Sequence, residues 1–353
     1  MKICSHCAAR LNAERTATDT GECDLCGGLL SQVDIFFDIF KEETKEIEFS
    51  NFIVGVDADE RYLKNDDDYR KEHCTDCKSF KKEFSTILGR KIEELLGKEA
   101  EFGNPELVFT VKQESGDYKL WTKSCYIQGR YRKLRRGIPQ SPWINPSRER
   151  EMERSISEYI GLIGLKYLKG RDYTFFASGR EDVDTLMLGE GRPFYVEILQ
   201  PKLRKIDLDL LAEQVKKFSN GGVEILALKL AAKEDIEELK GKVFDKSYEV
   251  GVKIEGSIEN IESKIKEFEG ITIHQRTPTR VLGLRKDRMR DRKIHSISIK
   301  ESEGGRIRLI ITAEAGTYIK EFVTGDNDRT NPSLSQRLGV NVQIEYLNVL
   351  EVN

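Results

Sequence analysis

The chain has 353 residues, of which 38% are hydrophobic and 34% are charged, and its net charge is −3. This length allows two or three domains with separate hydrophobic cores, and the acidic balance excludes a protein that is basic over its whole surface. No apolar run approaches a membrane span, and the N-terminus lacks the apolar segment of a signal peptide, so we expect no membrane association and a cytoplasmic location.

Two cysteine pairs open the sequence, Cys4-x-x-Cys7 and Cys23-x-x-Cys26, separated by 15 residues. Each pair places two thiolates on one turn, and two such turns close a tetrahedral site. We therefore expect Cys4, Cys7, Cys23 and Cys26 to hold a structural zinc ion. Four protein ligands leave no open position for catalysis. His6, inside the first pair, is expected on the surface.

The remaining cysteines indicate no second metal site. Cys74-x-x-Cys77 has only His73 and Asp76 as further ligands nearby, and the βαβ context of a thioredoxin-like redox pair is missing. We favour a pair without metal just before a helix. Cys125 lies in an apolar, alternating stretch and is expected in the core.

The elements of the N-terminal part follow from hydrophobic periodicity. Residues 29–55 indicate strands, or a helix and then a strand. A charged loop or exposed helix start follows at 58–72. An amphipathic helix is predicted over 79–97, where apolar residues recur near period 3.6, and strands over 106–112 and 118–128.

A basic segment, Gly129-Arg130-Tyr131-Arg132-Lys133-Leu134-Arg135-Arg136-Gly137, follows these strands. It can be a solvated basic loop or a surface that contacts phosphates, and we favour the second interpretation for Arg130, Arg132, Arg135 and Arg136. Three prolines between 139 and 146 predict a stiff linker. We therefore expect a zinc-containing domain over 1–143 and a second domain over 144–353.

Helices and strands mix in the second domain without strict alternation, which indicates an α+β fold with a mainly antiparallel mixed sheet. Helices are expected over 148–168, 207–219, 232–240 and 257–268. Strands are expected over 173–177, 195–199, 224–228, 248–256, 271–274, 294–300, 306–314 and 342–352.

The segment Ser178-Gly179-Arg180-Glu181-Asp182-Val183-Asp184 comes directly after the expected strand 173–177. Turn residues and charges often meet at strand ends, so a turn with a surface ion pair explains the segment without any chemistry. The functional interpretation is a carboxylate that a neighbouring guanidinium keeps ionised in a partly dry pocket.

Four stretches together carry a resemblance to a known family. They are Gly179-Arg180-Glu181-Asp182-Val183-Asp184, Gly191-Arg192-Pro193-Phe194, Gln275-Arg276-Thr277-Pro278-Thr279-Arg280-Val281 and Ala315-Gly316-Thr317-Tyr318-Ile319-Lys320-Glu321-Phe322-Val323. They resemble the archaeal and eukaryotic tRNA pseudouridine synthase that modifies uridines 54 and 55, a type that contains a THUMP domain. The zinc pairs and the basic segment resemble the same family's accessory domain, so the likeness covers nearly the whole chain.

The resemblance implies roles for particular residues. Asp182 stands where the family has its indispensable carboxylate and is the expected nucleophile, with Asp184 as the competitor and Glu181 facing solvent. Lys320 is expected to pair with Asp182 and, together with Arg180, to hold it as an anion. No cofactor is expected for catalysis.

Further residues are expected to contact the RNA. Leu347 would pack under the target base, Tyr318 belongs to the same motif as Lys320, and His295 stands where the family has a tyrosine against that base. Basic residues of a mobile loop over 276–293 would contact the tRNA backbone, among them Arg276, Arg280, Arg288 and Arg292. Arg192 would contact the backbone from an opposing basic surface.

The resemblance thus implies a tRNA-binding enzyme, an isomerase that converts uridine to pseudouridine, and a monomer is the simplest expectation. The accessory domain would hold the acceptor end of tRNA. Two other classes stay open. One is a non-catalytic, zinc-containing tRNA-binding protein on the same fold. The other is a metal-dependent RNA enzyme built on the carboxylates near 181–184. Such an enzyme would need further histidine or acidic metal ligands, and the chain has only four histidines.

Overall fold

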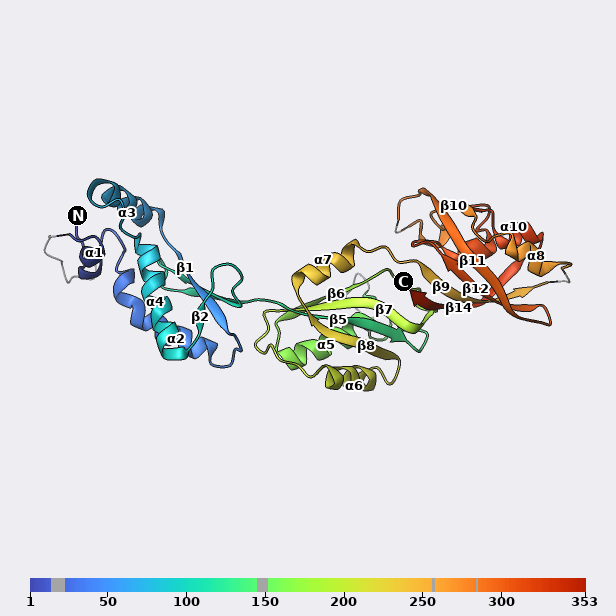
Figure 1. Cartoon of the computed structure of the whole chain (residues 1–353), viewed down its shortest axis with the longest axis horizontal. Coiled ribbons are helices and arrows are strands. Elements are labelled where there is room, and N and C mark those ends of the chain that lie inside the picture. Colours follow the sequence, from blue (N-terminus) through green and yellow to red (C-terminus); the bar gives the residue numbers. More distant parts are fainter. Residues whose placement is uncertain (14–22, 145–151, 256–257, 284) are drawn as a thin grey trace. The chain divides into compact units, whose positions relative to one another are not determined.

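The computed structural model describes residues 1–13, 23–144, 152–255, 258–283 and 285–353. The chain divides into two compact units (Figure 1). The first comprises Met1–Cys125, Tyr167–Asp172 and Ile198–Ile206, and the second Tyr126–Lys166, Tyr173–Glu197 and Asp207–Asn353. Among the described residues, no helix combines the length and apolar character that crossing a bilayer requires.

The first unit is built on a four-stranded sheet in the order β2-β1-β3-β4. Strand β1 pairs in parallel with β2 and β3, and β3 pairs antiparallel with β4. Its elements are α1 (Ser5–Arg10), η1 (Leu29–Gln32), α2 (Val33–Thr44), β1 (Asn51–Asp57), α3 (Glu60–His73), α4 (Phe80–Leu96), β2 (Glu99–Ala100), β3 (Leu107–Lys112) and β4 (Tyr118–Thr122).

Helix α4 shows how local sequence sets the ends of an element in this unit. The Ser79 hydroxyl accepts a hydrogen bond from Lys82 N at the helix start, and Gly97 ends the helix in the left-handed region at φ 62°. Phe80, Phe84 and other apolar residues of one face are buried. The helix predicted over 79–97 is therefore confirmed.

The second unit is built on a ten-stranded sheet. Its main path runs β13-β10-β11-β12-β9-β14-β7-β5-β8, and β6 pairs with β7 beside that path. Among the pairings of this sheet whose register is described, only β14 with β7 is parallel. The prediction of an α+β fold with a mainly antiparallel mixed sheet is confirmed.

The same unit carries seven helices or helical turns among the residues described. Its elements are β5 (Cys125–Lys133), α5 (Ile156–Leu168), β6 (Asp172–Ala177), β7 (Leu186–Leu199), α6 (Leu208–Phe218), β8 (Val223–Ala231), α7 (Lys233–Gly241), β9 (Lys246–Ile254), α8 (Ile261–Lys266), β10 (Thr272–Arg276), η2 (Thr279–Val281), β11 (Met289–Glu303), β12 (Arg306–Ala313), α9 (Ile319–Thr324), β13 (Thr330–Asn331), α10 (Leu334–Leu338) and β14 (Val342–Val352).

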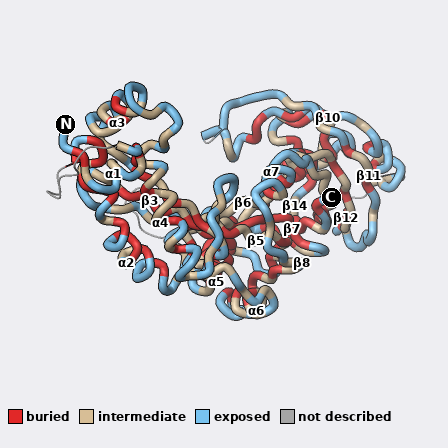
Figure 2. Tube along the Cα trace, turned by 60° about the vertical axis from the view of Figure 1, so that its left-hand side comes forward, coloured by how far each residue is buried: buried red, intermediate tan, exposed pale blue. Residues whose placement is uncertain are grey.

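The division between the units falls at Cys125, ahead of the boundary expected after residue 143. Strand β5 lies between β7 and β8 in the second sheet, so the segment after Cys125 belongs to that unit. Gln140, in the stretch expected as the start of a stiff linker, is buried, as is Ile138 just before that stretch. Figure 2 shows buried residues along β5, β7 and β14 of this unit. Hydrogen bonds from this segment to the second unit, described below, explain why it does not act as a linker.

We expected one mobile loop over 276–293, but both ends of this basic segment belong to strands. Strand β10 ends at Arg276 and β11 begins at Met289, so Arg290 and Arg292 lie on a strand. Helices α9 and α10 were not predicted. Each has fewer than two turns, too short for a hydrophobic period to be recognised.

Candidate active site and metal centre

Asp182 lies in the loop between β6 and β7, where the chain leaves a strand and turns. Its Oδ1 is 3.1 Å from Arg280 Nη1, and its Oδ2 is 3.2 Å from Lys320 Nζ. The side chain is 37% exposed. The carboxylate is thus held between two cations on a surface that a substrate can reach.

Lys320, one of the two cations beside Asp182, lies on the first turn of α9. Its ammonium also donates to both carboxylate oxygens of Asp184, at 2.9 and 2.8 Å. Burial works to raise the pKa of Asp184, but the Lys320 ammonium brings that pKa below its ordinary value. Asp184 has a side-chain exposure of 68%, against 37% for Asp182.

Arg280 provides the second cation beside Asp182, and a buried carboxylate holds it there. Its Nε donates to Glu321 Oε1 at 2.7 Å, and Glu321 is buried. The guanidinium therefore bridges a buried carboxylate and Asp182. We had expected Arg280 on an RNA-gripping loop and Arg180 beside Asp182. In the structure Arg180 is exposed, and the arginine that pairs with Asp182 is Arg280.

Buried side chains hold the main chain of this loop from below. Arg192 Nη1 donates to Ser178 O at 2.7 Å, and Gln140 Nε2 donates to Gly179 O at 2.9 Å. Lys133 Nζ donates to Asp182 O at 2.9 Å and to Val183 O at 3.1 Å. Four carbonyl groups of one short loop are fixed in this way, which limits where the Asp182 carboxylate can move.

Arg192 and Glu181 form a buried ion pair, with 2.8 Å between Arg192 Nε and Glu181 Oε2. Arg192 is 1% exposed, and Tyr131 donates its hydroxyl to Glu181. The expectations that Glu181 faces solvent and that Arg192 forms a basic surface are both wrong. Each of these charges can be buried because the other compensates it and hydrogen bonds satisfy the remaining groups.

Lys133 is the residue that sequence reasoning missed most clearly. Its Nζ also donates to Ile138 O at 3.0 Å, so all three ammonium protons have acceptors. Burial lowers the pKa of Lys133 to about 8, although nearby carboxylates oppose this. A signal was present: on β5 every second residue is buried, and Lys133 has the same parity as Ile127 and Tyr131.

The arginines of the basic segment engage protein groups. Arg130 donates to the carbonyls of Glu190, Gly191 and Val352, and Arg132 to Gly189 O. Arg135 pairs with Glu153, and Arg136 donates to Asn348 Oδ1 and to Leu347 O. Arg135 and Arg136 are exposed and Arg130 and Arg132 are half-buried, so phosphate contact stays a prediction for the exposed pair.

The residues expected around the base and its backbone lie in the second unit. Arg276 and Arg288 are exposed, and Arg292 is 3.5 Å from Glu314. Both backbone groups of Tyr318 bind the buried Gln275 amide, which fixes the start of α9. The Tyr318 hydroxyl accepts from Arg285.

His295 and Leu347 differ in how they are placed. The His295 Nε2 atom lies 2.9 Å from Asp245 Oδ2, and Leu347 is buried on β14. Tyr248 on β9 has no neighbouring motif in the sequence that would single it out. Burial raises the pKa of Tyr248 to about 12, although the positive charge of Arg192 opposes this. Tyr248 is buried and is two residues after Lys246 on the same strand.

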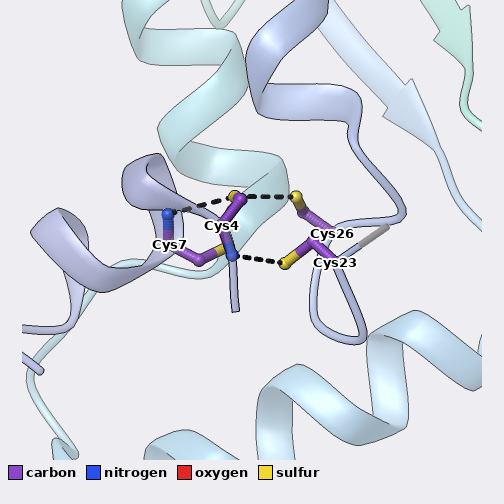
Figure 3. A group of neighbouring side chains, drawn as sticks. All are labelled: Cys4, Cys7, Cys23 and Cys26. Carbon is purple, nitrogen blue, oxygen red and sulfur yellow. Dashed lines mark hydrogen bonds between the residues drawn. The ribbon is translucent and has the colours of Figure 1, made fainter. Parts of the chain in front are cut away.

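The four N-terminal cysteines come together as predicted (Figure 3). The Sγ atoms of Cys4, Cys7, Cys23 and Cys26 all lie within 4.8 Å of one another, and three of the residues are buried. The main-chain N–H of Cys4 is directed at Cys23 Sγ, and that of Cys7 at Cys4 Sγ, both at 3.4 Å. N–H groups aimed at sulfur stabilise thiolates, so the cluster suits a metal ion that prefers four sulfur ligands.

The other cysteines play different parts. Cys74 and Cys77, between α3 and α4, are joined by a disulfide, a pairing that the sequence analysis did not predict. Cys125 is buried, as expected for a core residue, and His6 is exposed.

Comparison with known proteins supports the family resemblance directly. Residues 126–353 match the family model described as "Pus10, C-terminal", and residues 36–112 match "Pus10 THUMP domain, archaeal". The chain is 33% identical to "tRNA pseudouridine synthase Pus10" of Thermoplasma acidophilum, over 97% of this chain and 87% of the relative. It is 35% identical to the protein of the same name from Pyrococcus furiosus, over 99% and 95%. The chain therefore belongs to the Pus10 family of tRNA pseudouridine synthases, which are isomerases.

Proposed function

We propose that this enzyme converts uridine 54, uridine 55 or both in the T loop of tRNA, with Asp182 as the nucleophile. The observation that carries the proposal is the position of Asp182 between Lys320 and Arg280, at 3.2 and 3.1 Å. Two cations compensate its charge and orient its oxygens, while its side chain stays accessible. The Asp184 carboxylate, by contrast, has one cationic partner in the described hydrogen bonds, which is Lys320.

The reaction is an internal rearrangement of the nucleotide. The bond between ribose C1′ and uracil N1 breaks, the base turns, and a bond between C1′ and C5 forms. C5 loses its proton and N1 gains one, so no oxidant, reductant or second substrate is consumed. The Asp182 carboxylate can attack C1′, attack the base, or assist elimination, and all three routes place it against the flipped nucleotide.

An aromatic side chain is needed against the flipped base, and we assign this role to Tyr248 in place of His295. The His295 Nε2 atom lies 2.9 Å from Asp245 Oδ2. Tyr248 is two residues after Lys246 on β9, so the two side chains share one face of the strand, and Lys246 lies beside Gly179 in the Asp182 loop. Stacking on an aromatic ring is how proteins commonly hold an unstacked base.

The cysteine cluster is assigned a structural zinc ion, held by Cys4, Cys7, Cys23 and Cys26. Zinc would tie α1 to the segment before η1 and would take no part in the isomerisation. The first unit, with its THUMP domain, is proposed to bind tRNA and to set the distance to the T loop.

Pseudouridine mapping on an unmodified tRNA transcript tests the function. Wild-type protein should form pseudouridine at position 54 or 55, and Asp182→Ala should form none while still binding the tRNA. Transcripts with cytidine at 54 or at 55 separate the two positions. Binding without any pseudouridine from the wild-type protein would favour the alternative, a non-catalytic tRNA-binding protein on the same fold.

A further inference from the structure

Lys246, the first residue of β9, has an incompletely used ammonium group next to the active-site loop. Its Nζ donates one hydrogen bond, to Phe244 O at 3.2 Å. An ammonium group carries three donors, and within the described parts of the chain no other acceptor is bound to it. Lys133, by contrast, uses all three. The side chain of Lys246 is half-buried, so water does not surround it fully.

The spare donors lie beside the loop that carries Asp182. A Cβ atom built on Gly179 would be 3.1 Å from Arg192 Nη1, 3.5 Å from Lys246 Cε and 3.6 Å from Lys246 Nζ. Gly179 has φ 84°, a conformation that other residues rarely adopt, so this side of the loop carries no side chain. The ammonium therefore lies close to the main chain of the loop, three residues before Asp182, and it shares this place with the Arg192 guanidinium.

The charges around Lys246 leave it under-compensated. Arg192, which is also positive, is committed to Glu181 and to Ser178 O. The adjacent Asp245 carboxylate is shared by His295 and by the main-chain N–H of Ala315. Burial and the charge of Arg192 lower the pKa of Lys246 to about 8, while Asp245 raises it. An anion placed here would be stabilised by the Lys246 ammonium, whose charge no carboxylate hydrogen bond compensates in the described contacts.

We propose that Lys246 binds a non-bridging oxygen of the phosphodiester next to the target uridine. This inference rests on the proposed function, because it needs a flipped nucleotide at Asp182. Three residues of chain span at most about 11 Å, so Gly179 and Asp182 can engage one nucleotide. A phosphate oxygen carries negative charge and forms a charge-assisted hydrogen bond with the ammonium, whereas a uracil carbonyl is neutral.

The test combines a protein substitution with a change to one phosphate. Lys246→Met and wild-type protein are compared on ligated tRNAs that carry a neutral methylphosphonate on either side of the target uridine, or at a distant position. Equilibrium binding and single-turnover pseudouridine formation are both measured. A charge-assisted hydrogen bond of about 1.5–3 kcal/mol corresponds to a loss of roughly 10-fold to 150-fold in affinity or rate.

The proposal expects one adjacent methylphosphonate to weaken wild-type protein by the same factor as Lys246→Met, and to weaken Lys246→Met no further. Factors that multiply at both adjacent phosphates would overturn it, and would point to a contact with the base. Lys253→Met, on an exposed position of the same strand, is the matched control and should behave as wild type. If Lys246→Met does not fold, Lys246→Gln gives the same comparison.

The outcome is separate from that of the proposed function. Binding reports the phosphate contact even if no pseudouridine forms, and Asp182→Ala protein should show the same dependence of affinity on the adjacent phosphate. A loss of catalysis with this dependence intact would contradict the assigned function alone. An adjacent methylphosphonate without effect on wild-type affinity and rate would contradict the assignment of Lys246 alone.

Discussion

Replacing Lys133 by methionine should reduce catalysis strongly and stability little, although Lys133 is a buried charge. Methionine has similar length and no charge, so the packing is largely preserved. The three hydrogen bonds from Nζ, to Ile138 O, Asp182 O and Val183 O, are removed. Two of these carbonyls belong to the loop that carries the proposed nucleophile.

The change in stability follows from two opposing contributions. Lowering the pKa of this lysine to about 8 from an ordinary value of about 10.4 corresponds to roughly 3 kcal/mol of destabilisation at pH 7, which methionine removes. Asp182 O still accepts from Thr185 N, and Val183 O from Gly137 N, so only Ile138 O loses its donor in the described contacts. A lost buried partner costs about 1–3 kcal/mol, so at pH 7 Lys133→Met should range from unchanged stability to about 2 kcal/mol more stable than wild type.

The difference in stability shifts toward the wild-type protein as the pH rises, which gives an independent check. Above pH 8 the folded wild-type protein releases this proton before the unfolded chain does. Wild-type stability should therefore rise relative to Lys133→Met between about pH 8 and 10. Catalysis should behave in the opposite way, because the neutral amine keeps two donors for three carbonyls.

In the proposed mechanism, catalysis depends on where the loop holds Asp182. A displacement of about 1 Å can cost roughly 100-fold in rate, so we expect single-turnover pseudouridine formation to fall about 10-fold to 100-fold in Lys133→Met. Affinity for tRNA should change less than about two-fold if only the loop is affected, since phosphate contacts dominate binding. A folded Lys133→Met protein with the wild-type rate would refute the positioning role. Gln140→Met, which removes the hold on Gly179 O, should show a smaller loss of the same kind.

Three further predictions concern the other parts of the molecule. Lys320→Met should lower the single-turnover rate about 10-fold to 100-fold through loss of a charge-assisted hydrogen bond, and Lys320→Arg should recover part of it; equal rates for both variants would contradict a charge requirement. Wild-type protein should contain one zinc per chain by elemental analysis, and Cys26→Ser should lose it and melt at lower temperature, whereas an unchanged metal content would rule out this cluster. Arg288→Gln should reduce the salt slope of tRNA binding by about one phosphate contact, and an unchanged slope would place Arg288 outside the interface.

The sequence predicted most helices and strands of normal length. It also predicted one of the two cations that contact Asp182. The Lys320–Asp182 ion pair forms at 3.2 Å, as the motif around Lys320 implied. Arg280 could not be assigned to Asp182 in the same way, because 98 residues separate them and only the tertiary fold brings them together. An arginine inside a basic segment is expected to face RNA unless a carboxylate such as that of Glu321 is known to lie beside it.

Buried charges were the main source of error. Glu181 and Arg192 were assigned to the surface because single charged side chains rarely leave water. They are buried together, and neither sequence segment by itself reveals the partner. For Lys133 the strand period of β5 gave a usable signal, which the surrounding arginines concealed. Alternation on a strand deserves more weight than local charge when the two disagree.

Lys133 and Lys246 show why burial alone cannot assign a role to a lysine. Burial lowers the pKa of both to about 8, so electrostatics would rank them equally as functional candidates. The hydrogen bonds separate them. Lys133 gives three donors to carbonyls of its own chain, which makes it a part of the scaffold, whereas Lys246 gives one. Because Lys246 is half-buried and leaves two ammonium donors without a protein acceptor among the described residues, it can bind an anionic ligand, as proposed above, whereas Lys133 cannot.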